Sequence, residues 1–280
     1  MPARLHTLWR VTKEQERARA KRRYERQQAN LVRHEAERKR NAQVAAVVVA
    51  LLAVIGGFIL LAGKLGKDDK SAGASSSSTS AAPASLAAGC TAPPAVPNTE
   101  GKLSAPSADE VSAVTGKTVV AQLETNCGTI ELTLDGAKAP KTVASFVQLA
   151  QVGYWKDAPC HRLTVQGIFV LQCGDPTGGG SGNPGYGYGI ENPPADGTYP
   201  RGTVAMARTD DPNSNGGQYF IVYKDSDLPT DGGGYSIFGT VTAGMDIVDK
   251  IAAGGAEGGA PDGAPAFPIS TLSVTTETKD

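Results

Sequence analysis

The chain has 280 residues and a formal net charge of -1, which leaves room for a sizeable core and excludes a chain that is basic throughout. The charge is unevenly divided, however. Residues 1–43 hold thirteen Lys and Arg against five Glu, a net charge of +8, so the remainder carries about -9. This asymmetry predicts that two parts of the chain meet different surroundings.

The basic segment, residues 1–43, is rich in good helix formers but lacks an apolar stripe. We interpret it as a solvated helix near anionic lipid headgroups, and not as a nucleic-acid-binding element. Residues 44–63 follow as twenty residues without a charge. At about 1.5 Å rise per residue, such a helix spans roughly 30 Å, the hydrocarbon thickness of a bilayer. We therefore predict a single transmembrane helix.

The flanks of residues 44–63 predict the topology. Arg38, Lys39 and Arg40 precede the apolar run, so the N-terminus is expected in the cytoplasm and everything after Lys64 on the outer side of the cell membrane. A cleaved signal peptide is the main rival interpretation, but its apolar core and its basic segment should both be shorter.

Residues 64–117 are predicted to be a disordered linker. Their Ser/Ala-rich and Pro-rich composition cannot bury enough apolar surface to offset the entropy of ordering.

From residue 118 to 280 the pattern predicts one mainly β domain. Helices are expected over 139–153 and 245–255, each with apolar residues at helical spacing. Two strands are expected within the segment 160–175, and the others at 119–126, 129–135, 202–208, 217–223, 235–242 and 270–278. Eight short strands with two helices favour a closed eight-stranded antiparallel β-barrel capped by two α-helices, preceded by the transmembrane helix.

All four cysteines lie on the predicted outer side, where disulfides form. Three pairings are open to them. A hairpin over 160–175 would bring Cys160 and Cys173 together, so we favour this disulfide. Cys90 with Cys127 would then tie the linker to the domain, a pairing that the sequence does not fix. No CxxC motif is present, and a metal site is not expected.

The Gly-rich stretch 178–189 contains a G-x-G-x-x-G pattern at Gly180, Gly182 and Gly185. That pattern binds dinucleotides only where it follows a strand and opens a helix. Pro184 and a Gly/Tyr run follow here, so we interpret the stretch as a surface loop and expect no cofactor.

A polar and aromatic set remains on the strands: Arg162, Phe169, Gln172, Gln218 and Phe220. Alternation along a strand places Gln172 with Val170 on one face, and Gln218 with Phe220 likewise. Leu171, Tyr219 and Ile221 would then point into the barrel. The sequence therefore predicts an exposed face with a guanidinium, two amides and two aromatic rings, suited to a ligand that is part apolar and part amide.

Three stretches resemble the hallmarks of the cyclophilin family. They are CHRLTVQGIFVLQCGDP (160–176), TVAMARTDDPNSNGGQYFI (203–221) and IFGTVTAGMDIVDKI (237–251). APKTVASF (139–146) resembles the signature of the first helix of that family. The basic segment, the apolar run and the Ser/Pro-rich linker make the chain resemble membrane-anchored cyclophilins of actinobacteria in particular.

The resemblance implies a peptidyl-prolyl cis-trans isomerase that assists extracytoplasmic proteins to fold and acts on proline-containing polypeptides. No metal or cofactor is implied, and we expect a monomer. The alternative is a catalytically silent module of the same fold that docks a proline-bearing partner. The implied catalytic residues are Arg162, Phe169 and Gln172. The implied substrate-binding residues are Val170, Ala207, Arg208, Gln218, Phe220, Leu228 and Tyr235.

Several positions depart from the family pattern. Val170 stands where Met is usual, Arg208 where Asn is usual, and Tyr235 where many members have His. Two residues are added between Arg162 and Phe169, which predicts a longer turn between the two strands.

Overall fold

The computed structural model of the chain describes residues 85–99 and 101–279. The predicted basic segment (1–43) and transmembrane helix (44–63) lie outside these residues, as does the first part of the predicted linker. Among the helices of the described ranges, none has the length and apolar character needed to cross a bilayer.

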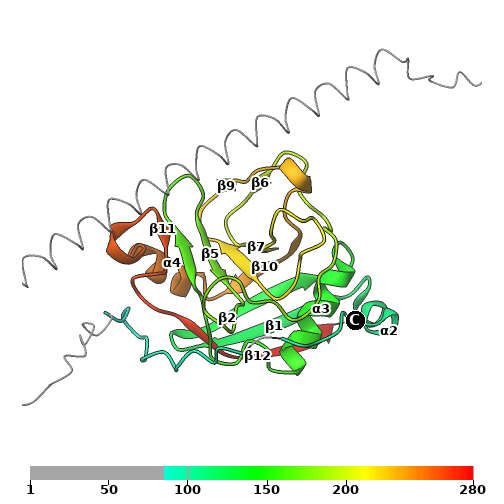
Figure 1. Ribbon diagram of the computed structural model, residues 1–280, viewed down its shortest axis with the longest axis horizontal. Helices are drawn as coiled ribbons and strands as arrows, with labels where there is room; N and C mark the ends of the chain where they lie inside the picture. Colours follow the sequence, from blue (N-terminus) through cyan, green and yellow to red (C-terminus); the bar gives the residue numbers. More distant parts are fainter. Residues whose placement is uncertain (1–84, 100, 280) are drawn as a thin grey trace, which may run out of the picture. The chain divides into compact units, whose positions relative to one another are not determined.

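One large antiparallel sheet is the central element of the described structure (Figure 1). Its ten strands pair in the order β11-β4-β5-β8-β7-β10-β2-β1-β12-β3, and β6 pairs separately with β9. The strands are β1 (Thr118–Thr125), β2 (Gly128–Asp135), β3 (Ala158–Pro159), β4 (Arg162–Thr164), β5 (Val170–Cys173), β6 (Thr198–Tyr199), β7 (Thr203–Met206), β8 (Tyr219–Val222), β9 (Ser226–Asp227), β10 (Ile237–Ala243), β11 (Asp262–Gly263) and β12 (Ser270–Lys279).

The mainly β class is thus confirmed, with ten strands in the main sheet where eight were predicted. The additional strands β3 and β11 have two residues each, too few to show an alternating pattern in the sequence. Within the described residues no ladder joins β11 to β3 at the two ends of the order. Closure of the sheet into a barrel therefore stays a prediction.

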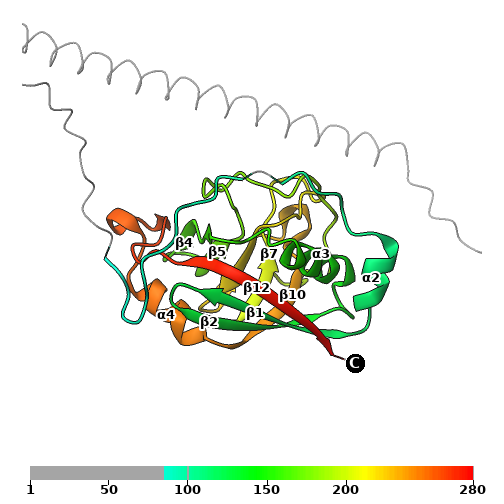
Figure 2. The same cartoon turned by 90° about the horizontal axis from the view of Figure 1, so that it is seen from below.

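Both predicted helices are present, as α3 (Pro140–Gln151) and α4 (Met245–Ala253), and they lie toward opposite ends of the sheet (Figures 1 and 2). Pro140 occupies the first turn of α3, where a missing N–H costs nothing. The carboxylate of Glu191 accepts from the Lys141 and Thr142 amides at 3.1 and 2.8 Å and so caps the helix from a distant loop.

A third helix, α2 (Ala108–Val114), falls inside the predicted linker and packs beside α3 (Figure 2). Ser107 and Glu110 form a capping box: the Ser107 hydroxyl accepts from the Glu110 amide, and the Glu110 carboxylate accepts from the Ser107 amide. The Ser-x-x-Glu spacing was present in the sequence as a signal for this helix.

The structure corrects the linker prediction from Ser85 onward. Residues 85–99 and 101–107, here called the strap, follow the surface of the sheet domain. Backbone amides of Thr91, Asn98 and Leu103 donate to Asn126, Pro176 and Pro184 at 2.8, 3.0 and 2.8 Å. Order in the strap comes from hydrogen bonds to the rest of the domain, which the composition of the strap itself could not reveal.

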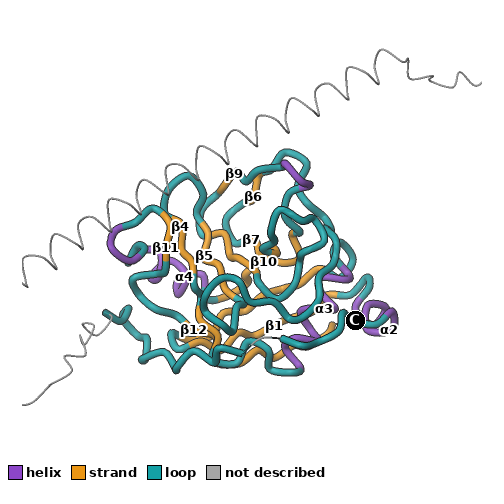
Figure 3. Tube along the Cα trace, in the orientation of Figure 1, coloured by secondary structure: helices purple, strands orange, loops and turns teal. Residues whose placement is uncertain are grey.

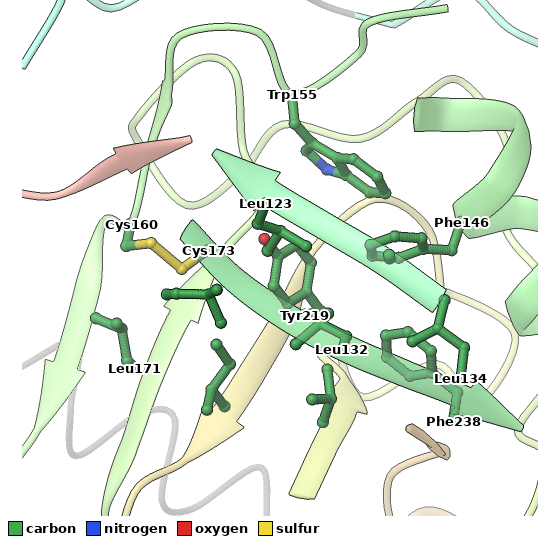
Figure 4. Close-up of a cluster of buried hydrophobic side chains, with 14 of the residues drawn as sticks. Leu123, Leu132, Leu134, Phe146, Trp155, Cys160, Leu171, Cys173, Tyr219 and Phe238 are labelled. Carbon is green, nitrogen blue, oxygen red and sulfur yellow. A yellow bond between two sulfur atoms is a disulfide. The ribbon is translucent and has the colours of Figure 1, made fainter. Parts of the chain in front are cut away.

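The main core lies on one face of the short strands. Leu171, Tyr219 and Ile221 are at most 1% exposed and belong to it, as the alternation predicted. The Phe146 ring of α3 packs against Trp155, Tyr219 and Phe238, with ring centroids 4.5, 5.9 and 5.7 Å away (Figure 4). These contacts attach α3 to the sheet through aromatic packing.

Two disulfides cross-link the domain. Cys160 and Cys173 are joined, as predicted, beside the main core (Figure 4). Cys90 and Cys127 form the second disulfide, which ties the strap to the turn between β1 and β2. This resolves the pairing that the sequence left open.

Asn126, which is 4% exposed, connects the strap with β12. Its amide nitrogen donates to the Thr91 carbonyl at 2.8 Å, and its amide oxygen accepts from the Ser270 amide at 2.8 Å. A buried side chain with both a donor and an acceptor is needed to satisfy the two backbone groups.

We predict that Asn126→Asp lowers the free energy of unfolding by about 3 kcal/mol, because a carboxylate cannot donate to the Thr91 carbonyl and is buried against it. Urea denaturation of the full chain under non-reducing conditions measures the change. Asn98→Asp, at an exposed strap position, is the control and should change stability by less than about 0.5 kcal/mol. Equal effects of the two substitutions would contradict the assigned role of Asn126.

Candidate functional site

Strands β4 and β5 present a guanidinium and an amide directly opposite one another. Arg162 pairs with Gln172 in the antiparallel register, and Leu163 pairs with Leu171. Both leucines are fully buried in the main core. Since side chains alternate along a strand, Arg162 and Gln172 lie on the opposite face, where both are half-buried.

The Arg162 guanidinium is held by two partners. Its Nε and Nη2 donate to Oδ1 and Oδ2 of Asp262, each at 2.7 Å, and its Nη1 donates to Oε1 of Gln172 at 3.1 Å. The hydrogen bonds to Asp262 raise the pKa of Arg162 above its ordinary value and lower the pKa of Asp262. Both groups therefore stay charged at neutral pH.

The hydrogen bonds continue from Gln172 to the Gly-rich loop. Nε2 of Gln172 donates to Oε1 of Gln218 at 2.9 Å. Nε2 of Gln218 in turn donates to the carbonyls of Gly180 and Gly182 at 3.0 and 2.8 Å. The loop that the sequence analysis set aside as a surface loop thus fixes one of the two amides of the site.

A second apolar cluster lies beside these polar groups, separate from the main core. It contains the predicted substrate-binding residues Val170, Phe220 and Leu228, with Ala207 and Tyr235 packed against it. Its further members are Tyr199, Ala205 and Val222, with Ile168 and Ile237 also packed against it. The exposed aromatic ring that we predicted at Phe220 is instead buried: Phe220 is 3% exposed, so its ring forms the floor of this face.

Tyr199 fixes the backbone of Tyr235 within this cluster. Its buried hydroxyl donates to the Tyr235 carbonyl at 3.1 Å and accepts from the Tyr235 amide at 2.8 Å. The Tyr235 ring meets the Phe220 ring edge-on, with centroids 5.7 Å apart. Tyr235 is therefore held in place from two sides.

The Arg208 side chain binds backbone carbonyls within its own domain. Nε donates to Gly234 at 2.8 Å, Nη1 to Thr209 at 2.8 Å and Nη2 to Asp231 at 3.2 Å. The guanidinium also lies over the Tyr235 ring, 4.9 Å from its centroid. These contacts hold the side chain against the segment 231–235.

Phe169 lies apart from the second apolar cluster. Its half-buried ring contacts Tyr223 edge-on, at 5.9 Å between centroids, and the Lys224 ammonium lies 4.4 Å from the ring centroid. The structure brings the other predicted residues together but holds this ring against the two residues that follow β8.

An open pocket of about 630 Å³ adjoins the two glutamines. Loop segments form its walls, and long loops surround this part of the domain (Figure 3). Its lining includes Gln172, Gly182, Ala207, Arg208 and Gln218. Side-chain amides and loop backbone therefore meet at one concave surface, which suits an extended peptide. Of the second apolar cluster and the residues packed against it, only Ala207 lines this pocket.

Comparison with known proteins decides the family. The family model for cyclophilin type peptidyl-prolyl cis-trans isomerases matches residues 120–275, more than half of the chain. This chain belongs to the cyclophilin family. The probable peptidyl-prolyl cis-trans isomerase B of Mycobacterium tuberculosis is 41% identical over 204 residues, covering 68% of this chain and 65% of that protein.

Other cyclophilins give similar results. The probable isomerase B of Mycobacterium leprae is 41% identical over 203 residues, covering 68% of this chain and 67% of that protein. A peptidyl-prolyl cis-trans isomerase of Helicobacter pylori is 36% identical over 140 residues, covering 49% and 83%. A crystal structure of a Cryptosporidium parvum cyclophilin aligns with 28% identity and a TM-score of 0.49, covering 58% and 99%. This chain thus spans about two thirds of the length of the mycobacterial cyclophilins.

Four residues that contribute to the site of this cyclophilin were not predicted from the sequence. Asp262 lies in a two-residue strand, and Tyr199 in another, so neither carries a periodic signal. Gly180 and Gly182 act through backbone carbonyls, which no side-chain motif identifies. In the described part of the chain, no three or more His, Cys, Asp or Glu residues are grouped so that they could hold a metal ion.

Asp175 holds the Gly-rich loop at its first turn. The carboxylate is fully buried and accepts from the Thr177 amide and hydroxyl at 2.8 and 2.7 Å, and from the Gly182 amide at 3.1 Å. Burial raises the pKa of this carboxyl, but the hydrogen bonds from Thr177 and Gly182 outweigh burial, so the pKa is lowered overall.

We predict that the cyclophilin domain loses stability as the pH falls below about 5. In the unfolded chain the Asp175 carboxyl takes up a proton near pH 3.9, whereas in the folded domain its lowered pKa keeps it charged to a lower pH. Protons therefore favour the unfolded state until the pH has fallen through the lowered pKa. Asp175→Asn should lower stability at pH 7 by about 1–3 kcal/mol, because its amide cannot accept from both Thr177 and Gly182. It should also flatten the acid dependence. Urea denaturation at pH 7 and pH 3 measures both, with exposed Asp210→Asn as the control.

Proposed function

We propose that this cyclophilin is a peptidyl-prolyl cis-trans isomerase that accelerates rotation about the peptide bond before proline. The observation that carries the proposal is the Arg162 guanidinium, which is bound by Asp262 and by Gln172 and keeps two N–H groups for a ligand. Gln218 in turn fixes the amide of Gln172. Relatives that are 41% identical over most of this domain bear the name of the same activity.

The reaction needs a stabilised transition state and no covalent chemistry. A peptide bond resists rotation because the nitrogen lone pair delocalises into the carbonyl, which gives a barrier of about 18–20 kcal/mol. Bonds before proline populate both isomers but interconvert over roughly tens to hundreds of seconds. When the bond is twisted, the lone pair returns to nitrogen and becomes a hydrogen-bond acceptor.

Arg162 is suited to donate to that nitrogen. Of the five N–H groups of an arginine, three are engaged by Asp262 and Gln172, so one remains on Nη1 and one on Nη2. A bond from a cation to the pyramidal nitrogen forms in the twisted state and is absent from the planar ground state. Such a contact lowers the barrier and does not tighten ground-state binding.

The neighbouring groups would hold the two sides of the peptide bond differently. The cluster of Val170, Phe220, Leu228 and Tyr235 offers an apolar seat for the proline ring. Gln172 and Gln218, whose amides are already oriented, would bind peptide groups of the residues before it. One side of the bond is then fixed while the other turns, which is catalysis by positioning and preorganised polar groups.

We predict that Arg162→Ala lowers kcat/KM for a proline peptide by on the order of 10²- to 10³-fold, because a preorganised donor is lost. A protease-coupled assay with the full chain in non-ionic detergent measures the rate. Arg201→Ala is the matched control, since Arg201 also forms a bidentate pair with an aspartate, and it should leave the rate unchanged.

The same assay separates the isomerase from a silent peptide-binding adaptor. An adaptor needs no cation at the proline nitrogen and would bind the peptide without accelerating its isomerisation. Binding with no acceleration in the wild-type chain would therefore favour the adaptor and contradict the isomerase.

We further infer that the domain is anchored to the cell membrane, on its outer side, through residues 44–63. The uncharged run of residues, its basic flank and the two disulfides, which form in oxidising compartments, support this arrangement. We also infer that the sheet acts as a closed barrel. In support, β3 at one end of the pairing order is separated along the chain by only Cys160 and His161 from β4, the strand next to β11 at the other end.

We predict that the full chain sediments with membranes and that a variant lacking residues 44–63 remains in the supernatant. Protease added to intact cells without a wall should digest the domain of the full chain, because it is expected outside. A cytoplasmic protein serves as the control for cell integrity. Survival of the domain under this treatment would place it on the other side of the membrane.

A further inference from the structure

We propose that Asp262 is a positioning residue for catalysis, which orients the Arg162 guanidinium so that its two remaining N–H groups are in place for the peptide. This inference rests on the proposed isomerase function and deepens it. It concerns a residue on the short edge strand β11, outside the three stretches that resemble the family hallmarks.

The direction from which Asp262 binds Arg162 is the first argument. The carboxylate takes Nε and Nη2, which form one side of the planar guanidinium, at 2.7 Å each. Gln172 takes one hydrogen of Nη1. The carboxylate thus grips the side of the guanidinium, and one N–H on each terminal nitrogen remains for a ligand.

A second arginine of the same domain shows the opposite arrangement. Arg201 donates from Nη1 and Nη2 to Asp249, each at 2.7 Å, so that carboxylate closes the end of the guanidinium. The Arg201 Nη1 also donates to the Tyr223 carbonyl. The two pairs have the same chemistry and similar exposure. Only the carboxylate at the site leaves the Nη1 of its arginine unbound.

The backbone holds Asp262 beside Arg162 independently of its side chain. Asp262 pairs with Thr164 and Gly263 with Leu163 where β11 meets β4. The Val165 amide also donates to the Pro261 carbonyl at 2.9 Å. A substitution of the carboxylate should therefore leave the loop where it is and change only what holds the guanidinium.

The solvent exposure of the Arg162–Asp262 ion pair indicates that it affects the orientation of the guanidinium more than the folding stability of the domain. The side chains of Arg162 and Asp262 are 38% and 47% exposed, and ion pairs this open contribute little to folding. A long arginine side chain populates many rotamers, however, and a bidentate carboxylate selects one of them. A donor that is already in place at the twisted amide nitrogen does not need to be ordered during the reaction.

The test compares Asp262→Asn with Asp249→Asn in the full chain, by the protease-coupled assay and by binding of the same proline peptide. Asn keeps the shape of Asp but has one acceptor for the two donors of Arg162. We expect kcat/KM to fall about tenfold in Asp262→Asn, with peptide affinity changed less than about threefold. The urea midpoint should stay unchanged. Asp249→Asn should retain the wild-type rate, and Asp262→Glu, which keeps two acceptors, should recover part of the loss.

Hydrogen exchange of the arginine Nε–H groups, followed by NMR, provides a readout that does not depend on activity. The Nε–H of Arg162 should exchange slowly in the wild-type chain and faster in Asp262→Asn, because its carboxylate partner is lost. The Nε–H of Arg201 should be unaffected by Asp262→Asn, since Asp249 binds only the terminal nitrogens.

Wild-type kcat/KM in Asp262→Asn, or unchanged exchange of the Arg162 Nε–H, would overturn the proposal. A wild-type chain without isomerase activity would contradict the proposed function and the catalytic part of this inference. In that case the Arg162 exchange rate would still decide whether Asp262 orients the guanidinium.

Discussion

The site depends on a chain of hydrogen bonds that can run in only one direction. A carboxylate only accepts and a guanidinium only donates, so the pair of Asp262 and Arg162 fixes the start of the chain. The carbonyls of Gly180 and Gly182 only accept, so they fix its end. Between these ends, the amides of Gln172 and Gln218 have one orientation each that satisfies all four hydrogen bonds. The polar groups are thereby set before a ligand arrives.

The sheet places these hydrogen-bonded side chains at the right spacing. β11, β4, β5 and β8 are neighbours in the pairing order. Asp262, Arg162 and Gln172 lie on the first three of these strands, and Gln218 lies just before β8. Strand alternation buries one face of the ribbon in the main core and leaves the other to the polar groups. The Cys160–Cys173 disulfide closes the ribbon at one end and keeps Arg162 opposite Gln172. The second apolar cluster then adjoins the polar chain because Val170 and Phe220 lie two residues from Gln172 and Gln218 on the same strands.

Much of this arrangement could be predicted from the sequence, and the exceptions have physical reasons. The alternation around Leu171 and Tyr219 gave the correct face for Gln172 and Gln218, since one face of a half-buried strand must be apolar. The order of the strap could not be predicted, because it depends on backbone partners such as Asn126 and Pro184 that lie far along the chain. The role of Gly182 was missed because its partner, Gln218, lies far along the chain. The role of Asp262 was missed because a strand of two residues shows no alternating pattern. The Ser107 and Glu110 capping box was available in the sequence and would have located α2.

Asp262, the carboxylate that binds the Arg162 guanidinium, lies 100 positions after Arg162 in the sequence. A ribosome therefore releases Arg162 long before Asp262, and a nascent chain that has reached only α4 carries the guanidinium without its carboxylate. On this geometry, a partly synthesised or C-terminally truncated cyclophilin would hold its donor in many orientations. Synthesis of β11, and not of the central ribbon, would mark the moment at which the guanidinium can be held in one orientation.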